Sequence, residues 1–546
     1  MARAKWLVPT VVNLAALIQA AQVHFSLELT WQKGSPNGVE REFIFVNDQF
    51  PGPPLILDEG DDVSGTPWAD GVSGLSQWGI RPGQKYTYKW HADQYGTYWY
   101  HSHDKARMMD GLYGAIYIRP SSGDSPVSMI SSDPTDIEAM ENARRDPQLV
   151  LLSDWDHLTS DAYMQAEMDT GYDIFCSDSI LVNGQGSVYC KDPEELTDMQ
   201  APEVKAILQG FWEHHPDALP GNLNSGCIPS EGLQSVFQVD SDDEWVSFNF
   251  ISAAGIKALV LSIDEHPMYV YEVDGRSVEP QLAHSIPIYN GQRYSVMVRL
   301  DQNPGNYTVR IAGNGNQVIS GFATLSYRGG DENQRQSIPY ITYGGLNTTS
   351  SVISLNTTSL PPYPPIQPAT YADDFHLLTL GRINSSWEWT LDGTSFLPAN
   401  LAEIQPVLFN PQTTELASAL KIETKNNTWV DIVFQLAIPE GTYLQPPHPI
   451  HKHSNKAFLI GASQGKFNWS SISDAAKDSP GSFYEVPTYR DTFVTSPAGE
   501  AWVAIRYHVE NPGAFLLHCH TETHLASGMG MVILDGIDAW PELPTI

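Results

Sequence analysis

The chain has 546 residues, of which 41% are hydrophobic and only 17% are charged, a composition typical of a folded globular protein. Acidic residues (64) outnumber basic ones (30), and the formal net charge is −34 at pH 7. This charge excludes nucleic acid as a partner, because binding it requires basic side chains that neutralise phosphates, and argues against docking on anionic lipid. At roughly 150 residues per domain, the length predicts three or four domains, or fewer large β-domains.

The N-terminus has the features of a secretory signal peptide over residues 1–21. Arg3 and Lys5 precede an apolar run over residues 7–18, and two alanines follow the run. The run is too short and too polar for a transmembrane helix, so we expect no membrane span. Glycosylation sequons support export to the extracellular space or cell wall. They begin at Asn306, Asn347, Asn356, Asn384, Asn426 and Asn468.

Most of the chain has the pattern of β-strands. Short alternating or aromatic-rich runs recur between turn residues, and glycine (42) and proline (39) are abundant enough for many tight turns. The clearest expected strands span residues 85–90, 114–118, 244–250, 294–299 and 429–434. Helical patterns are few, over residues 135–145 and 203–208. The sequence therefore predicts an all-β protein built from sandwiches or Greek-key barrels.

Two polar segments divide the chain. Residues 121–147 lose the β-alternation and can carry a linking helix, and residues 347–368 are rich in Ser, Thr and Pro, as in a semi-rigid spacer. We therefore predict three β-domains, at residues 22–125, 145–330 and 370–546.

The four cysteines are too few for a disulfide scaffold. Cys176, Cys190 and Cys227 lie close together in sequence and could form one disulfide with one thiol left over. The sequence does not decide which two of them pair. Cys519 stands alone.

Histidines are clustered in three short motifs. They are His101-Ser-His103, His448-Pro-Ile-His451-Lys-His453 and His518-Cys519-His520-Thr-Glu-Thr-His524. On a strand, residues i and i+2 point to the same face, so each His-x-His motif presents two imidazoles on one side. Cys519 then points to the opposite side from its two neighbours, and one strand can serve two metal sites.

The site on the cysteine side has the composition of a blue-copper centre. Cys519, His448 and His524 supply two imidazoles and a thiolate, and Met529 can take a weak axial position. The paired imidazoles on the other face suit further copper ions. A single His-x-His or a single methionine is weak evidence, but the three motifs together are not plausibly a coincidence.

These motifs give the chain a resemblance to the multicopper oxidases, and among them to fungal laccases of the conidial-pigment type. The matching segments cover nearly the whole mature chain. They are Trp68-Ala-Asp-Gly71, Gly96 to His103, Asp110 to Gly114, Asn183 to Gly186, His448 to His453 and Asn511 to His524. The resemblance implies three cupredoxin-like Greek-key β-barrels with four copper ions. One is a blue copper that takes electrons from substrate, and three form a trinuclear cluster that reduces O₂ to water.

The resemblance also implies a role for each candidate residue. His448, Cys519, His524 and Met529 would bind the blue copper, and His451 the mononuclear copper of the trinuclear cluster. The coupled copper pair would be held by His101, His103, His453, His518 and His520. Asp70 and Glu522 match carboxylates that help to deliver protons to oxygen, which O₂ reduction consumes.

The chain departs from the family at one place. The family has a fourth motif, His-Trp-His-Gly, which should fall between residues 63 and 65, where this chain has only Ser64. His91 is the nearest histidine that could replace this motif, but a single histidine here is typical of an ordinary strand residue. The gap, on the order of 20 residues or two strands with a turn, removes one ligand of the mononuclear copper and one of the coupled pair. Either the natural protein contains a segment, encoded by an exon, that this chain lacks, or the protein lacks a working trinuclear cluster.

The resemblance predicts a copper-dependent oxidase that abstracts single electrons from phenols, with O₂ as acceptor. Released radicals would couple in pigment, melanin or other aromatic polyketide formation, and a Met axial ligand favours easily oxidised substrates such as hydroxynaphthalenes and catechols. We expect a secreted monomer with no nucleic-acid or membrane partner. The alternatives are a ferroxidase, which the acidic charge would suit, and a copper protein that accepts electrons without O₂ turnover.

Overall fold

The computed structural model describes residues 23–60, 66–121, 125–192, 194–196, 214–224, 226–313, 315, 317–329, 336–397, 405–413, 416–438, 445–495 and 499–544. The predicted signal peptide, the join near residues 63–65 and the helix expected over residues 203–208 lie outside these described residues.

The N-terminal region forms two small sheets. Strands β1 and β2 pair antiparallel, and β3, β5 and β4 form a three-stranded sheet in that order. The bounds are β1 (Leu29–Gly34), β2 (Arg41–Val46), β3 (Gly52–Asp58), β4 (Gly96–His101) and β5 (Tyr113–Arg119). The segment between β3 and β4 leaves this sheet, and its Val72 and Leu75 pack into a core with residues of the C-terminal region.

The middle region is a sandwich of two sheets with strand orders β13-β10-β15-β16-β8 and β12-β11-β14-β9-β6-β7. The apolar faces of the two sheets share one core. The strands are β6 (Gln148–Trp155), β7 (Ser179–Val182), β8 (Val236–Val239), β9 (Trp245–Ser252), β10 (Leu259–Ile263), β11 (Met268–Val273), β12 (Arg276–Ala283), β13 (Ile286–Ile288), β14 (Arg293–Arg299), β15 (Asn306–Gly313) and β16 (Ile319–Tyr327). The helices here are α1 (Pro134–Arg145), α2 (Ser160–Thr170) and the short α4 (Gly221–Asn224).

The C-terminal region repeats the sandwich plan, with strand orders β18-β17-β20-β25-β22-β23 and β19-β27-β26-β21-β24. Its strands are β17 (Asp374–Arg382), β18 (Trp389–Leu391), β19 (Lys421–Glu423), β20 (Trp429–Leu436), β21 (Pro449–Lys452), β22 (Ala457–Gln464), β23 (Tyr489–Arg490), β24 (Thr492–Val494), β25 (Ala501–His508), β26 (Gly513–Cys519) and β27 (Gly530–Asp535). Its helices are α6 (Ile472–Asp478) and α7 (Glu522–Ser527).

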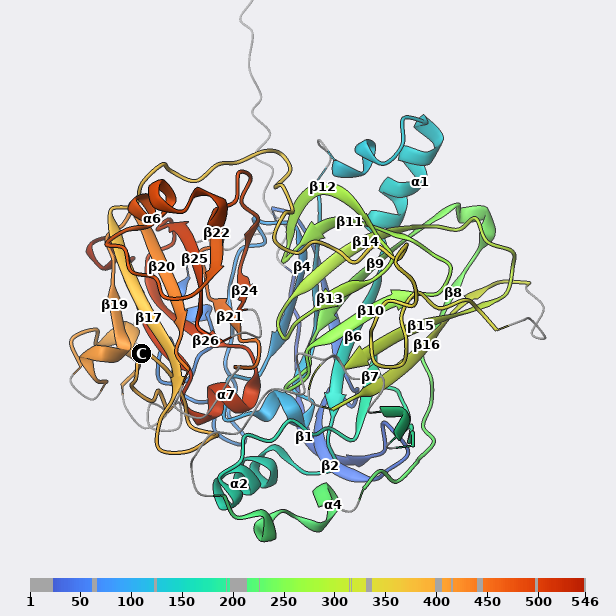
Figure 1. The fold of residues 1–546 in the computed structure, drawn as a ribbon, viewed down its shortest axis with the longest axis horizontal. Coiled ribbons are helices and arrows are strands. Elements are labelled where there is room, and N and C mark those ends of the chain that lie inside the picture. The colour runs from blue at the N-terminus through green and yellow to red at the C-terminus, as the bar shows by residue number, and fades with distance from the viewer. Residues whose placement is uncertain are drawn as a thin grey trace, which may run out of the picture.

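Strand β4 of the N-terminal region lies between the two sandwiches. Figure 1 shows β4 between the C-terminal sheets on the left and the middle sheets on the right, with α7 at the edge of the C-terminal sandwich. The approach of β4 to the middle region is close, since a Cβ added at Gly96 would lie 2.6 Å from the Cα of Gly275. Motifs that are far apart in sequence therefore meet in the centre of the molecule.

The predicted all-β class is confirmed, and four of the five expected strands correspond to β5, β9, β14 and β20. The helix expected over residues 135–145 is α1, which begins after the cap Asp133. The prediction of a strand over residues 85–90 is wrong, because this segment has no regular secondary structure and its Tyr86 and Tyr88 rings are exposed. The adjacent sheet, β3-β5-β4, provides it with no partner strand.

The structure pairs Cys190 with Cys227 in a disulfide and leaves Cys176 as an exposed thiol. Of the six sequon asparagines, Asn426 is half-buried and the others are exposed. No helix among the described residues is both long enough and apolar enough to cross a membrane.

Candidate copper centres

Cys519 and two histidines form a compact, fully buried group, which we call the cysteine cluster (His448, Cys519 and His524). The Cys519 Sγ lies 3.9 Å from His448 Nδ1 and 3.5 Å from His524 Nδ1, and the two Nδ1 atoms are 3.2 Å apart. Three donor atoms thus face a common centre, as a thiolate and two imidazoles must to hold one metal ion.

Local structure brings these three side chains together. His448 precedes Pro449, the first residue of β21, and β21 pairs with β26 in a register that places Ile450 opposite Cys519. His524 lies on α7, the single-turn helix that follows β26. The chain after α7 returns to the cluster, because the Met529 amide donates to His524 O and the Cys519 amide donates to Met529 O.

Polar and aromatic neighbours hold the two imidazoles in place. His448 Nε2 lies 3.1 Å from Gln445 Oε1, an acceptor that leaves Nδ1 free for a metal. His524 Nε2 lies 3.6 Å from Asp173 Oδ1, and the Trp389 ring centroid is 4.7 Å from both imidazole centroids. Asp173 comes from the middle region, so a residue of another sandwich contacts the cysteine cluster.

Burial keeps the free ligands neutral. It raises the pKa of the Cys519 thiol to about 12, and it lowers the pKa of His448 well below its ordinary value, with the neighbouring His524 adding to the shift. Neutral imidazoles are the form that binds metals, whereas the thiol must lose its proton when a metal binds. The donor set fits copper.

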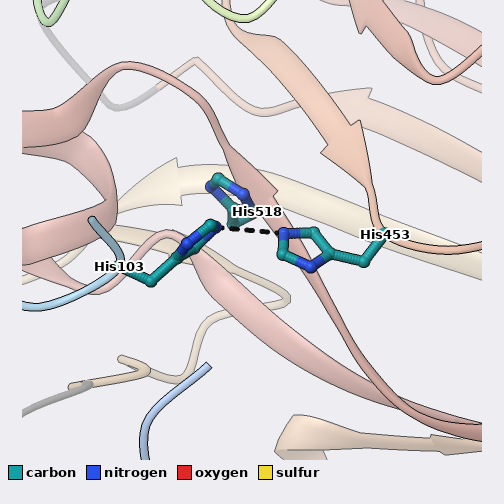
Figure 2. Close-up of side chains that lie close together, drawn as sticks. All are labelled: His103, His453 and His518. Carbon is teal, nitrogen blue, oxygen red and sulfur yellow. Dashed lines mark hydrogen bonds between the residues drawn. The ribbon is translucent and has the colours of Figure 1, made fainter. Parts of the chain in front are cut away.

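The second group, which we call the histidine cluster, consists of six imidazoles from three motifs. Its members are His101, His103, His451, His453, His518 and His520. Ligand nitrogens of His103, His453 and His518 lie within 4.8 Å of one another. Figure 2 shows these three imidazoles pointing toward one another, with the 3.2 Å contact between the Nε2 atoms of His103 and His453 dashed.

The other three rings surround this centre. The His101 ring centroid is 4.4 Å from that of His103 and 5.0 Å from that of His520. The His451 centroid is 5.0 Å from that of His453. Trp99 stacks on His101 at 4.1 Å and lies 5.2 Å from His520, so β4 contributes both an imidazole and the ring that supports it.

Hydrogen bonds orient most of these rings through Nδ1. The Nδ1 atoms of His101 and His518 lie against the backbone carbonyls of Ser102 and Cys519, at 3.1 and 2.8 Å. His453 Nδ1 lies 2.9 Å from a carboxylate oxygen of Asp70. A ring that donates through Nδ1 offers Nε2 to a metal.

Two buried ring nitrogens of this cluster, His518 Nε2 and His520 Nδ1, have no hydrogen-bond partner among the residues that the structure describes. Leaving a buried polar atom unpaired is costly, and metal ligation would satisfy it. Burial and the neighbouring imidazoles also depress every assigned histidine pKa in this cluster, to about 3 for His520. The side chains therefore fit a site for more than one copper ion.

The two clusters lie on opposite faces of one strand. On β26 and the residue after it, His518 and His520 belong to the histidine cluster, while Cys519 belongs to the cysteine cluster. This alternation agrees with the period of two in a β-strand, from which it was predicted. The peptide bonds beside Cys519 connect the two clusters covalently.

Glu522 is buried on α7, between His520 and His524 in sequence, and one of its carboxyl oxygens has no hydrogen-bond partner in the described part of the chain. Burial raises its pKa from 4.5 to about 8, with the charge of Asp154 adding to the shift. The carboxyl is thus protonated in the folded protein at neutral pH. A proton held at this position is available for transfer.

This pKa predicts how stability depends on pH. In copper-free protein the folded state keeps a proton that the unfolded state releases between pH 4.5 and about 8, so folding stability falls as pH rises through this window. The Glu522→Gln substitution removes this pH dependence. The free energy of unfolding of the variant, relative to that of the unsubstituted chain, should therefore rise from pH 5 to pH 8 by on the order of a few kcal/mol. Urea unfolding at several pH values measures this, and parallel curves for the two proteins would contradict the assignment.

Several neighbours of the clusters were not found by sequence reasoning, namely Asp173, Gln445, Trp389 and Asp491. Asp173 lies 346 residues before Cys519 in the chain and belongs to no motif. Trp99 is the exception, because it lies within the Gly96 to His103 segment that carried the family resemblance.

Comparison with known proteins gives the same assignment. Multicopper oxidase family models match residues 62–123, 146–330 and 384–538. Laccase abr2 of Aspergillus fumigatus is 60% identical over 98% of each chain, and multicopper oxidase GIP1 of Gibberella zeae is 42% identical over 97% of this chain and 86% of its own. The crystal structure of a laccase from Botrytis aclada, 21% identical, has the same fold with a TM-score of 0.69 over 95% of this chain and 88% of that one.

The comparison also bears on the missing motif. The alignment with the Aspergillus laccase spans 573 residues, more than this chain contains, so that relative has stretches with no counterpart here. The match of the N-terminal family model begins at residue 62, beside the join where His-Trp-His-Gly was expected. Family models matching most of the chain, a laccase 60% identical along its length and the cupredoxin-like fold together establish that the chain belongs to the multicopper oxidase family.

Proposed function

We propose that this chain is a laccase-like oxidase, which removes single electrons from phenolic substrates and delivers them to O₂, forming water. The observation that carries the proposal is the cysteine cluster, whose three donor atoms converge beside a strand that continues into the histidine cluster. When bound, copper at the two clusters would supply the one-electron acceptor for substrate and the centre for O₂ reduction.

Substrate would approach the cysteine cluster from the side of His524. This histidine lines a small pocket of about 50 Å³ between the middle and C-terminal regions, together with Phe175, Lys257 and Tyr289. The Phe175 ring meets the His524 ring edge-on, with centroids 6.4 Å apart. An aromatic ring seated at the mouth of this pocket would be close enough to His524 for electron transfer.

The resemblance supplies the individual ligand assignments, and the convergence of the donor atoms supports them. His448, Cys519 and His524 would hold the blue copper together with Met529, which is fully buried. His451 would hold the mononuclear copper, and the other five imidazoles of the histidine cluster would hold the coupled pair. The axial methionine favours easily oxidised phenols, such as catechols and hydroxynaphthalenes, because a sulfur donor stabilises oxidised copper.

Asp70 and Glu522 would handle protons. Asp70 accepts a hydrogen bond from His453 Nδ1, which fixes that ring and places a carboxylate beside the histidine cluster. Glu522 would hold a proton at its carboxyl oxygen and give it up when oxygen is reduced. The radicals released from phenols would couple outside the protein, in pigment or other aromatic polyketide formation.

The proposal distinguishes the two copper centres. The cysteine cluster has its full ligand set in this chain, whereas the histidine cluster has six of the eight histidines implied by the resemblance. We infer that the chain as printed loads blue copper and accepts electrons, and that its O₂ turnover is slow or absent. We further infer that the natural protein is a secreted, monomeric glycoprotein that contains the missing segment and four copper ions.

Purified protein reconstituted with copper should be blue and should oxidise a diphenol faster than Fe(II), because Phe175 and Tyr289 place aromatic rings in the pocket at His524. Copper analysis, visible absorbance, and O₂ uptake with each reductant measure this. Four copper ions per chain with steady O₂ uptake would contradict the inferred defect in the histidine cluster. A preference for Fe(II) would favour a ferroxidase instead.

A further inference from the structure

Arg293, the first residue of β14, is buried where the three regions of the chain meet. Its guanidinium forms a fork with Asp491 of the C-terminal region, with N–O distances of 2.7 and 2.8 Å. It also donates to Thr97 O on β4 and to Gly291 O, both at 3.1 Å. One side chain of the middle region therefore holds the N-terminal and C-terminal regions together.

The Asp491 side of this contact leads directly to His451. His451 Nδ1 lies 3.1 Å from Asp491 O and 3.6 Å from its carboxylate. The same carboxylate accepts from Lys456 Nζ at 3.1 Å and from Thr492 Oγ1 at 3.0 Å, and Thr492 Oγ1 also contacts the His451 ring. Asp491 is thus fixed on several sides, and a shift of its backbone would move the acceptor that orients His451.

The Thr97 side leads to the other imidazoles. Thr97 lies two residues before Trp99 and four before His101 on the same strand, and Trp99 stacks on His101. The backbone before Arg293 also packs against His520, since a Cβ added at Gly291, which has a φ of +81°, would lie 2.3 Å from that ring. Arg293 therefore contacts β4, which carries His101, and Asp491, which contacts His451.

We propose that Arg293 is a positioning residue of the histidine cluster, which sets the spacing between the strand that carries His101 and the strand that carries His451. The inference rests on the proposed copper binding at this cluster. It gives the middle region, from which neither cluster takes a histidine among the described residues, a role in assembling the site. A flexible lysine cannot replace the planar fork, because it lacks the two parallel N–H groups that fix the geometry.

The fork is oriented from a second side as well. Asp274 Oδ1 accepts the Arg293 backbone amide at 2.9 Å, while its Oδ2 accepts Arg490 Nε at 2.9 Å. Arg490 precedes Asp491, so the two aspartates and two arginines form a closed ring across the interface between the middle and C-terminal regions. A buried network with this many bonds has one favoured arrangement, which is what a fixed ligand geometry needs.

The test uses the full chain, stripped of copper and titrated with Cu(II) in competition with a chelator. Arg293→Lys should weaken the binding of copper that gives no blue colour by about 10- to 100-fold, as expected for loss of a group that orients metal ligands. Its blue absorbance should be unchanged, because the described contacts of Arg293 do not reach the cysteine cluster. The electron paramagnetic resonance spectrum of the non-blue copper should also change, which a loss of stability alone would not cause.

A matched control lies within the C-terminal region. Arg506 forms a buried fork with Asp431 at 2.6 and 2.8 Å, and its third bond goes to Ala369 O, away from both clusters. Arg506→Lys removes the same kind of fork and should leave the non-blue copper affinity unchanged. Asp491→Asn provides a second variant that breaks the fork while keeping the side-chain shape, and it should weaken the same copper.

Four outcomes would overturn the proposal. The first two are an unchanged affinity for non-blue copper in Arg293→Lys and in Asp491→Asn. The others are an equal loss of this affinity in Arg506→Lys, and an unsubstituted chain that binds no non-blue copper. Absence of blue absorbance in the natural chain would instead contradict the proposed function, while the non-blue affinities would still decide the role of Arg293.

Discussion

Replacing Cys519 by serine should abolish the absorbance at about 600 nm, where a copper–thiolate bond absorbs, and should reduce diphenol oxidation to background. Serine keeps the shape of the side chain but removes the sulfur that lies 3.5 Å from His524 Nδ1 and 3.9 Å from His448 Nδ1. The hydroxyl remains protonated and is a poor ligand for copper. Visible spectra and diphenol oxidation rates measure both effects.

The histidine cluster should survive this substitution. Cys519 faces the opposite side of β26 from His518, so non-blue copper should be retained while electron entry is lost. The chain also offers a matched control in its other free thiol, Cys176, which is exposed. Cys176→Ser should remain blue and should accept electrons from a diphenol as the unsubstituted chain does. A blue, active Cys519→Ser protein would remove the basis of the whole assignment.

Inserting a segment that carries His-Trp-His-Gly between Val63 and Gly65 should produce the largest gain in activity. The resemblance implies that this segment supplies two further imidazoles to the histidine cluster, one for the mononuclear copper and one for the coupled pair. With eight histidines the copper content should rise to four ions per chain, and O₂ uptake with a diphenol should become steady. Metal analysis and an oxygen electrode measure these two results.

A control insertion of the same length with alanines in place of the two histidines separates ligation from folding. It should restore the length of the first domain without raising O₂ uptake. If the histidine-bearing insertion gave no gain either, the reading of this chain as a copper protein that accepts electrons without turnover would be favoured. Transcript sequencing across residues 63–65 independently decides whether the natural product contains the segment.

The irregular segment over residues 85–90 illustrates where a sequence pattern fails. Its Lys-Tyr-Thr-Tyr-Lys-Trp alternation is a good strand signal, yet the segment remains outside every sheet and exposes Tyr86 and Tyr88. A strand forms only when a neighbouring strand accepts its hydrogen bonds, and the sheet beside it has no such neighbour among the described residues. A lost pair of strands in the first domain would account for this.

The sequence by itself determined the fold class and the chemistry of the two clusters. Both depend on local rules, since alternation along a strand separates Cys519 from His518 and His520, and a thiolate with two imidazoles and a methionine is the ligand set of a blue-copper centre. The disulfide between Cys190 and Cys227 was left open, because three cysteines that lie close together in sequence cannot be told apart without coordinates.

Only the tertiary structure decided which groups orient the ligands. Asp173 beside His524, Asp70 beside His453 and the Arg293 fork on Asp491 all join residues more than 150 positions apart in the chain. Such contacts depend on how the three β-regions pack, and a short polar side chain leaves no periodic signal of its distant partner. The candidate ligands could be predicted from the spacing within three short motifs, whereas the groups that orient them come from distant parts of the chain that meet them only in the folded protein.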